Sequence, residues 1–332
     1  MKKLSILFVI FFSVSLLGQS NELISNVKHQ FWGQVQYVNS ETTGDVQTFQ
    51  MKRFRIGAKG DMLKNLKFAF LFEMANNPFL LQGWLDYVIR PEVNIRIGMF
   101  KYPFGIENYT SATVWDLINP SYVSSGITYK LGSEGGKLRD IGLQASGKFS
   151  LGEKAGLTYY AMLMNGNGIN TKDNNKQKDI VGRVKFNFDK MLQIGASYFT
   201  GTTDVPNTTT QVNENAFGVD VIFNSKIANR RLKVQGEYIT ATYEVVGGEV
   251  KPGGFYAHAL YCLIPATLEA VVRYDSYSND TNTDLKKNRT TLGVAYYLAK
   301  KQRISANYEL ISDDYNVNTG NLFTLQFQYA LQ

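Results

Sequence analysis

Arg53 and Arg55 stand two residues apart in a segment with the alternating pattern of a β-strand. Side chains at this spacing point to the same face of a strand, about 6.5–7 Å apart. Guanidinium groups hold oxyanions through paired, charge-assisted hydrogen bonds, so the two could pass an anion from one to the other. The alternative is that each arginine forms an ion pair with a carboxylate on a neighbouring strand. The elements that surround the pair decide between these roles.

Signals for enzymatic chemistry are weak. The two histidines, His29 and His258, lie far apart in the sequence, and neither a Gly-x-Ser-x-Gly elbow nor a phosphate-binding glycine loop is present. Segment 280–291 begins with the acidic spacing of a calcium loop, but Leu285 and Thr291 replace its glycine and its glutamate. We therefore expect no enzyme, no metal site and no cofactor.

The elements that must position the arginines follow a period of two. In segment 322–332, aromatic and aliphatic residues alternate with threonine, glutamine and alanine. Successive side chains of a strand point to opposite faces, so one face is apolar and the other small and polar. The same pattern predicts about sixteen strands, at residues 30–38, 49–60, 66–75, 82–90, 93–100, 139–149, 156–165, 179–188, 191–200, 216–224, 231–242, 255–262, 267–275, 289–298, 302–311 and 322–332.

The connections between these strands alternate in length. Short turns such as 91–92 and 189–190 alternate with longer segments such as 166–178 and 276–288, which are rich in Asn, Thr, Asp and Gly. Transmembrane β-barrels keep short periplasmic turns at one end and long extracellular loops at the other. The pattern predicts an all-β fold, a transmembrane antiparallel β-barrel; an exported soluble all-β protein is the alternative.

Targeting and composition agree with export. Residues 1–20 have the pattern of a secretory signal peptide, with Lys2 and Lys3 before an apolar stretch. We expect residues 21–332 to form a single barrel domain.

The formal charge of the chain is +7, or +5 without Lys2 and Lys3, and no run of like charges indicates a nucleic-acid partner. The single Cys262 excludes a disulfide within the chain.

If the apolar face of each strand meets membrane lipid, the alternate residues line an aqueous pore. Eleven of them are basic: Arg53, Arg55, Lys59, Lys67, Arg96, Arg183, Lys185, Arg231, Lys233, Arg273 and Arg303. Seven are acidic: Glu73, Asp86, Asp220, Glu237, Glu269, Asp275 and Glu309. Basic linings favour anions and acidic linings favour cations. The excess predicts a mild anion preference, with a water-filled pore of ordinary mixed charge as the alternative.

Three stretches carry a family resemblance: Lys-Arg-Phe-Arg-Ile-Gly-Ala-Lys-Gly at 52–60, Gly-Trp-Leu-Asp-Tyr-Val at 83–88, and Asn-Ile-Arg-Ile-Gly-Met-Phe-Lys-Tyr-Pro-Phe-Gly-Ile-Glu at 94–107. In these the chain resembles the phosphate-selective porin O and P family of Gram-negative outer membranes. The resemblance implies a sixteen-stranded porin, a homotrimer, and a third extracellular loop that folds into the pore. Arg53, Arg55, Lys59, Arg96 and Lys101 fall in the matching motifs. The acidic Glu73 and Asp86 depart from a dense basic array.

Residues 101–138 form the longest break between predicted strands and contain aromatic, aliphatic and charged residues. Loops longer than about 12–15 residues are usually functional or disordered. We expect the apolar residues of this loop to pack on the inner wall and the loop to constrict the pore. Its charged residues are then candidates for the narrowest ring: Lys101, Glu107, Asp116, Lys130, Glu134 and Lys137.

The sequence thus predicts an outer-membrane porin for passive diffusion of small hydrophilic solutes, with an anion preference. One alternative is a channel specific for phosphate or polyphosphate. Another is a non-conducting barrel in an assembly or secretion system, and a lipid-hydrolysing barrel enzyme is the most distant. The expected partners are outer-membrane lipid, small anionic solutes that could include phosphate, and two further copies of the chain.

Overall fold

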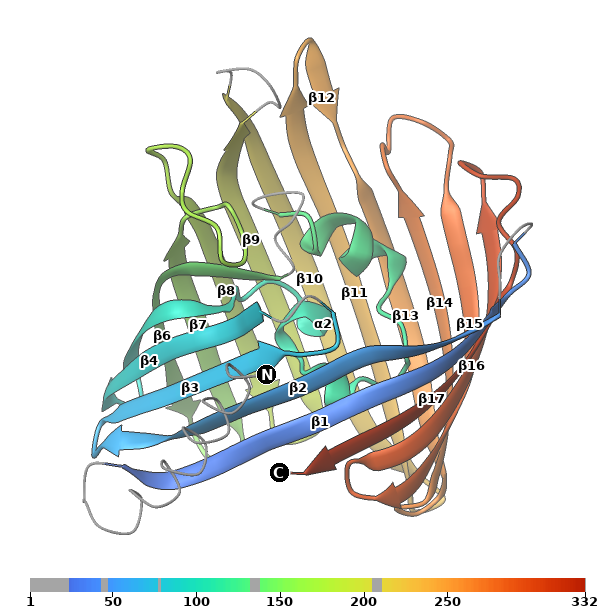
Figure 1. Ribbon diagram of the computed structural model, residues 1–332, viewed down its shortest axis with the longest axis horizontal. Helices are drawn as coiled ribbons and strands as arrows, with labels where there is room; N and C mark the ends of the chain where they lie inside the picture. The colour runs from blue at the N-terminus through green and yellow to red at the C-terminus, as the bar shows by residue number, and fades with distance from the viewer. Residues whose placement is uncertain (1–23, 43–46, 77–78, 132–137, 205–210, 332) are drawn as a thin grey trace, which may run out of the picture.

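The computed structural model describes residues 24–42, 47–76, 79–131, 138–204 and 211–331. The predicted signal peptide, residues 1–20, lies outside the described residues, as do Glu134 and Lys137 of the predicted constriction loop. The described residues form seventeen strands in one antiparallel sheet (Figure 1). In chain order they are β1 Ser25–Ser40, β2 Thr48–Leu63, β3 Leu66–Glu73, β4 Phe79–Arg90, β5 Val93–Lys101, β6 Arg139–Leu151, β7 Ala155–Met164, β8 Asp179–Phe188, β9 Leu192–Asp204, β10 Gln211–Ile227, β11 Arg230–Val245, β12 Gly248–Val250, β13 Gly253–Ile264, β14 Leu268–Ser278, β15 Lys287–Ala299, β16 Gln302–Asp313 and β17 Leu322–Leu331.

The sheet closes on itself because β1 pairs with both β2 and β17. The three-residue β12 pairs only with the end of β11, which continues its ladder with β13. Sixteen of the strands in the described part of the chain therefore make the wall. The predicted all-β, sixteen-stranded antiparallel barrel is confirmed; the small β12 ribbon was not predicted.

Among the segments that the structure describes, seven connections of two or three residues between successive strands of the wall lie at one end of the barrel, called here the short-turn end. They span residues 64–65, 91–92, 152–154, 189–191, 228–229, 265–267 and 300–301. At residues 228–229 both φ angles are positive, 50° and 60°, as a two-residue type I′ hairpin requires. The opposite, long-loop end carries longer connections, including 165–178, 279–286 and 314–321.

The two faces of the wall differ in chemistry, as the alternation predicted. Where β1 pairs with β17, Gln34 donates to Gln328 (Nε2 to Oε1, 2.8 Å) and Gln36 donates to Gln326 (2.8 Å) inside the barrel. Large apolar side chains are exposed on the outside, among them Leu143, Ile180, Ile194, Val221, Val272, Leu292, Val294 and Phe327. An apolar outer band suits the hydrocarbon core of a membrane. No helix in the described segments has the length and apolar character to cross a membrane.

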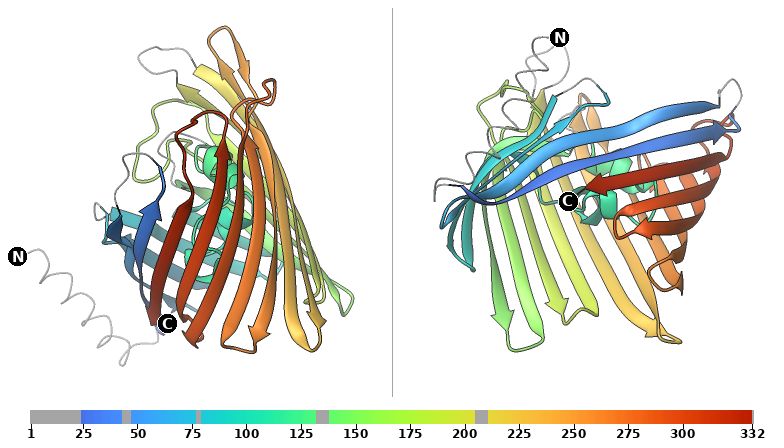
Figure 2. Two further views of the ribbon diagram at one scale, coloured as in Figure 1. Left: turned by 90° about the vertical axis from the view of Figure 1, so that its right-hand side faces the viewer. Right: turned by 60° about the horizontal axis from the view of Figure 1, so that its bottom comes forward.

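Between β5 and β6, residues 102–131 leave the wall and enter the barrel (Figures 1 and 2). They are called here the interior segment. It contains the helical turn α2 Ile106–Tyr109, the 3₁₀ turn η1 Ala112–Val114 and the wider turn η2 Ser124–Thr128. Wall residues from distant strands can therefore contact the same interior segment inside the lumen.

Candidate functional site

The interior segment leaves β5 through Pro103 and Gly105. Proline cannot continue a central ladder, and Gly105 has a φ of 70°, in the left-handed region that favours glycine. A Cβ at Gly105 would lie 2.4 Å from Oε1 of Glu237 on β11. That oxygen accepts a hydrogen bond from the backbone N–H of Ile106 (2.9 Å). Glycine therefore permits the close approach through which a wall carboxylate holds the start of α2.

Apolar residues of the interior segment form a core with the inner wall. Phe104, Val123, Ile127 and Leu131 are almost completely buried. They belong to one cluster with inward residues of several strands, Met162, Met164, Val181, Phe199, Ala216, Ile239, Tyr256 and Tyr277. Burial of a large apolar side chain stabilises by about 1.5–3 kcal/mol, so this cluster fixes the segment firmly to the β7–β14 side of the barrel.

Buried arginines of the wall also hold the segment through its main-chain carbonyls. The bonds join Arg273 to Asn119 (3.0 Å), Arg289 to Pro120 (2.7 Å) and Arg303 to Trp115 (2.6 Å). Asp275 pairs with Arg273 (3.1 Å) and Arg289 (3.0 Å), and accepts from the N–H of Tyr122 (2.9 Å). Two predicted pore-lining residues, Arg273 and Arg303, therefore anchor the segment.

Glu107 folds the interior segment onto itself. One carboxylate oxygen accepts from both the N–H (2.8 Å) and the hydroxyl (2.7 Å) of Ser121. The other lies 3.4 Å from the Arg273 guanidinium, and the Glu107 carbonyl accepts from the Trp115 indole (3.2 Å). Glu107 is buried (7% exposed), so its contacts are those of a structural tie within the segment.

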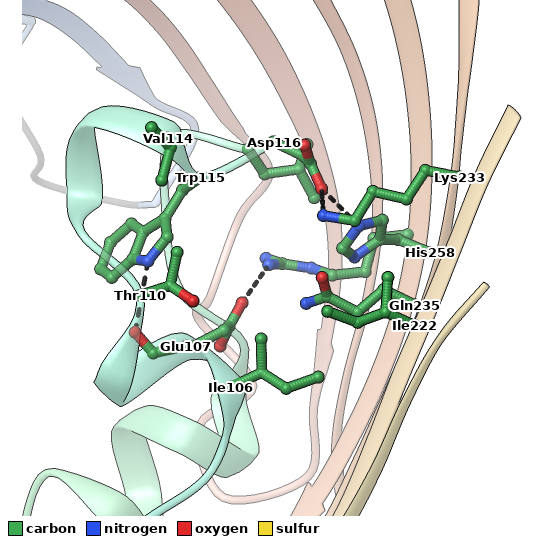
Figure 3. A pocket seen from close by; sticks show the side chains of 12 residues that line it. Ile106, Glu107, Thr110, Val114, Trp115, Asp116, Ile222, Lys233, Gln235 and His258 are labelled. Atoms are coloured by element: carbon green, nitrogen blue, oxygen red, sulfur yellow. Dashed lines mark hydrogen bonds and ion pairs between the residues drawn. The ribbon is translucent and has the colours of Figure 1, made fainter. Parts of the chain in front are cut away.

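Asp116 ties the segment to β11 and β13 of the wall (Figure 3). It lies 2.6 Å from Nζ of Lys233 on β11 and 2.9 Å from Nε2 of His258 on β13. Burial opposes ionisation of Asp116, but the hydrogen bond to His258 and the charge of Lys233 outweigh it and hold the pKa of the carboxyl well below its usual range. A cavity of about 210 Å³ adjoins this contact, and its charged groups are largely paired with one another.

A second cavity, of about 290 Å³, lies between the interior segment and the β2–β6 side of the wall. We call it the basic cavity. Among the described residues, its charged lining comprises the carboxylate Glu73 and five cations: Lys52, Arg53, Arg55, Lys101 and Arg139. The structure thus brings together Arg53, Arg55 and Lys101 from the predicted set.

The two arginines of the opening motif have different partners in this cavity. Arg55 pairs with Glu73 on β3 (2.8 Å) and lies over the Trp32 ring (4.8 Å). Arg53 donates to Gln34 (2.7 Å) and lies over the Trp115 ring (5.4 Å). Within the described part of the chain Arg53 has no ion pair. A carboxylate therefore neutralises Arg55 and leaves the charge of Arg53 facing the cavity.

The sequence matches the family described as phosphate-selective porin O and P over residues 26–249 and 223–331. The chain belongs to this family. The resemblance in the three sequence stretches is confirmed, and the barrel is that of a porin. No match was found among the curated proteins.

Solved porin structures share its fold. The anion-selective porin from Comamonas acidovorans is 16% identical with a TM-score of 0.70, covering 92% of this porin and 99% of that chain. The outer membrane channel DcaP of Acinetobacter baumannii is 14% identical with a TM-score of 0.66, covering 92% and 97%. OmpT of Vibrio cholerae in its trimer form is 15% identical with a TM-score of 0.61, covering 92% and 100%. At these identities the likeness establishes the barrel fold.

Several other predicted lumen residues of this porin form cross-strand contacts in the wall. Arg96 pairs with Asp86 through two bonds (2.6 and 2.7 Å) and lies over the Trp84 ring (4.0 Å). Arg183 pairs with Asp220 (2.6 Å). Lys185 lies over the Tyr160 ring at 5.6 Å. Carboxylates therefore match the charges of Arg96 and Arg183, whereas Lys185 has no ion pair among the described residues.

A third group of predicted residues lies near the short-turn end. Lys59 and Lys67 line a cavity of about 340 Å³ together with Lys28 and Asp61. Arg231, near the start of β11, pairs with Glu269. These residues line the wall away from the basic cavity, so the eleven predicted basic residues do not form one site.

Lys130, predicted for the constriction ring, is exposed on the interior segment.

Two functional arginines of this porin were missed by the sequence reasoning. Arg289 shares its inward face with Thr291 and Gly293, so the alternation along β15 could have identified it. Arg139 was not detectable in this way, because alternation places it with the outward Ile141 on β6. It enters the lumen directly after Leu138, whose φ is 70°. Arg139 nevertheless lines the basic cavity.

Proposed function

We propose that this porin is a channel of the Gram-negative outer membrane through which small anionic solutes diffuse passively. In this orientation the short-turn end faces the periplasm and the long-loop end faces the exterior. The interior segment narrows the lumen and the basic cavity selects by charge. The observation that carries the proposal is the composition of that cavity: among the described residues five cations and one carboxylate line it, and Arg53 has no ion pair with any of them.

Electrostatics gives the direction of the preference. A cleft lined by one sign of charge with low-dielectric walls concentrates counter-ions and raises their rate of entry. Arg96, Arg183 and Arg273 contribute little net field, because each lies beside a carboxylate. We therefore expect selectivity to depend mainly on the basic cavity.

The test is the reversal potential of single channels in planar bilayers with a potassium chloride gradient. Wild type should favour chloride, and the double substitution Arg53→Gln, Arg55→Gln should shift the reversal potential towards cations. Lys64→Gln is a matched control, since it removes one cation from an exposed turn at the short-turn end. Cation preference in wild type, or no shift in the double variant, would contradict the proposal.

A channel specific for phosphate or polyphosphate is a second candidate, which the description of the family favours. Its distinguishing result is chloride current that low concentrations of phosphate block. Absence of any conductance in correctly folded protein would instead favour an assembly or secretion component. A homotrimer is proposed as the functional form, supported by the trimer form of the structurally similar OmpT.

A further inference from the structure

The basic cavity has an apolar side as well as a charged side. Five aliphatic or aromatic residues and Tyr129 line it, the five being Phe79, Leu81, Ala112, Trp115 and Leu138. Leu81, Trp115 and Leu138 are each at least nine-tenths buried, so packing fixes their positions. A ligand in this cavity meets hydrocarbon on one side and cations on the other.

The charged side is arranged for one anionic group. Arg53 makes a single hydrogen bond among the described residues, through Nη1 to Gln34. Its remaining N–H groups can donate to a ligand, and a carboxylate matches the planar fork of a guanidinium. Glu73 neutralises Arg55, whereas Arg53 has no carboxylate partner among the described residues and lies next to the ring of Trp115.

Inorganic oxyanions match only half of this cavity. Phosphate presents polar oxygens in every direction, and any oxygen turned towards Leu81 or Trp115 loses water without gaining a donor. Burial of a polar group without a hydrogen bond is unfavourable. An organic anion avoids this cost, because its apolar body can contact Leu81 and Trp115 while its carboxylate contacts Arg53.

The size of the cavity restricts the ligand further. Small-molecule sites usually have volumes of about 300–1,000 Å³, and the basic cavity, at about 290 Å³, lies just below the lower limit of that range. It can accept a single aromatic ring or a branched aliphatic group, with one carboxylate.

We infer that the basic cavity is a binding site for small organic monoanions with an apolar body, such as aromatic carboxylates, and prefers them to inorganic oxyanions. This inference rests on the proposed function, because the cavity must lie on the solute path. The site both concentrates these anions and slows their passage.

The experiment is the block of single-channel chloride current by added benzoate. Acetate has the same carboxylate without the ring, benzyl alcohol has the ring without the charge, and inorganic phosphate is a purely polar anion. We expect benzoate to block at concentrations at least about tenfold lower than any of the three, a difference equal to about 1.4 kcal/mol. Equal block by acetate, or stronger block by phosphate, would overturn the inference.

Two substitutions locate the site. Arg53→Gln should weaken the benzoate block about tenfold or more, and Leu81→Ser should weaken it while leaving the weak acetate effect unchanged. Arg53→Lys should restore part of the block, since lysine keeps the charge without the planar fork. Circular dichroism checks that each variant remains a β-barrel. A benzoate block that survives Arg53→Gln places the site elsewhere and overturns the inference.

The reversal potential without benzoate tests the proposed function separately. Anion preference combined with equal block by benzoate and acetate overturns the organic-anion site and leaves the porin function standing. Cation preference overturns the proposed function, and calorimetric titration of the detergent-solubilised protein with benzoate and acetate then tests the site directly. Binding of benzoate that Arg53→Gln abolishes supports the site, and equal heats from the two anions overturn it.

Discussion

Asp116 is the residue through which the interior segment reaches Lys233 and His258 on the wall. We predict that Asp116→Asn loosens this contact, since loss of one partner of a buried polar group costs about 1–3 kcal/mol. Single-channel recordings should show more frequent current fluctuations than wild type. Asp173→Asn is the matched control, because Asp173 pairs with the exposed Lys178 on a surface loop. Equal noise in the two variants would argue against an anchoring role for Asp116.

The ionisation of Asp116 also predicts how the current fluctuations depend on pH. Its folded-state pKa lies below the unfolded value, which is about 3.9, because His258 and Lys233 favour the ionised form. Its stabilisation is therefore complete above the unfolded pKa and is lost only as the pH falls through the lower, folded value. We predict the same frequency of wild-type fluctuations at pH 7 and at about pH 4.5. A rise over this interval that is absent in Asp116→Asn would contradict the prediction.

Gly105 is required where the chain enters the lumen. We predict that Gly105→Ala lowers the thermal midpoint followed by circular dichroism, because the new Cβ meets Oε1 of Glu237 at 2.4 Å. Left-handed backbone alone costs a non-glycine residue about 1–2 kcal/mol. Gly152→Ala separates the two effects, since Gly152 has a φ of 72° with no atom within 4 Å of its added Cβ. Gly105→Ala should be the more destabilising; equal midpoints would contradict the steric argument.

At the scale of elements, the interior segment and the wall have separable roles. The wall is closed by its own ladders, so replacement of residues 108–128 with a short glycine–serine linker should leave the β-barrel signal in circular dichroism. Single-channel conductance should rise severalfold because the lumen widens. A similar replacement within loop 165–178, which lies at the long-loop end, serves as the control. Unchanged conductance after the first replacement would place the constriction elsewhere.

The alternating pattern predicted the wall because lipid on one face and water on the other impose a period of two on every strand. It did not predict which charges neutralise each other. Arg55 meets Glu73 only because β2 and β3 share a particular register, whereas Arg53 meets Trp115, which comes from the interior segment. The course of that segment depends on contacts distant in sequence, such as those of Asp116. The alternating pattern also groups Arg139 with the outward Ile141, although Arg139 lines the basic cavity.

At the scale of the whole molecule, we predict three copies in the functional assembly. Native mass spectrometry of the detergent-solubilised protein should give three times the mass of the mature chain. The apolar outer face of the barrel can be covered by lipid or by neighbouring copies, and OmpT, which has a similar fold, was solved in a trimer form. A single-chain mass at all detergent concentrations that keep the barrel folded would contradict this prediction.

The pairing of β1 with β17 constrains how the barrel can assemble. Phe31 lies opposite Leu331 and Ser40 opposite Leu322, so the first and last strands meet across almost the whole sequence. Until β17 is in place, the partial sheet has two open edges, and unpaired backbone groups in hydrocarbon cost several kcal/mol each. A strand-by-strand insertion would accumulate this cost. The wall must therefore enter the bilayer in a concerted step, or with its edges shielded until the last strand docks.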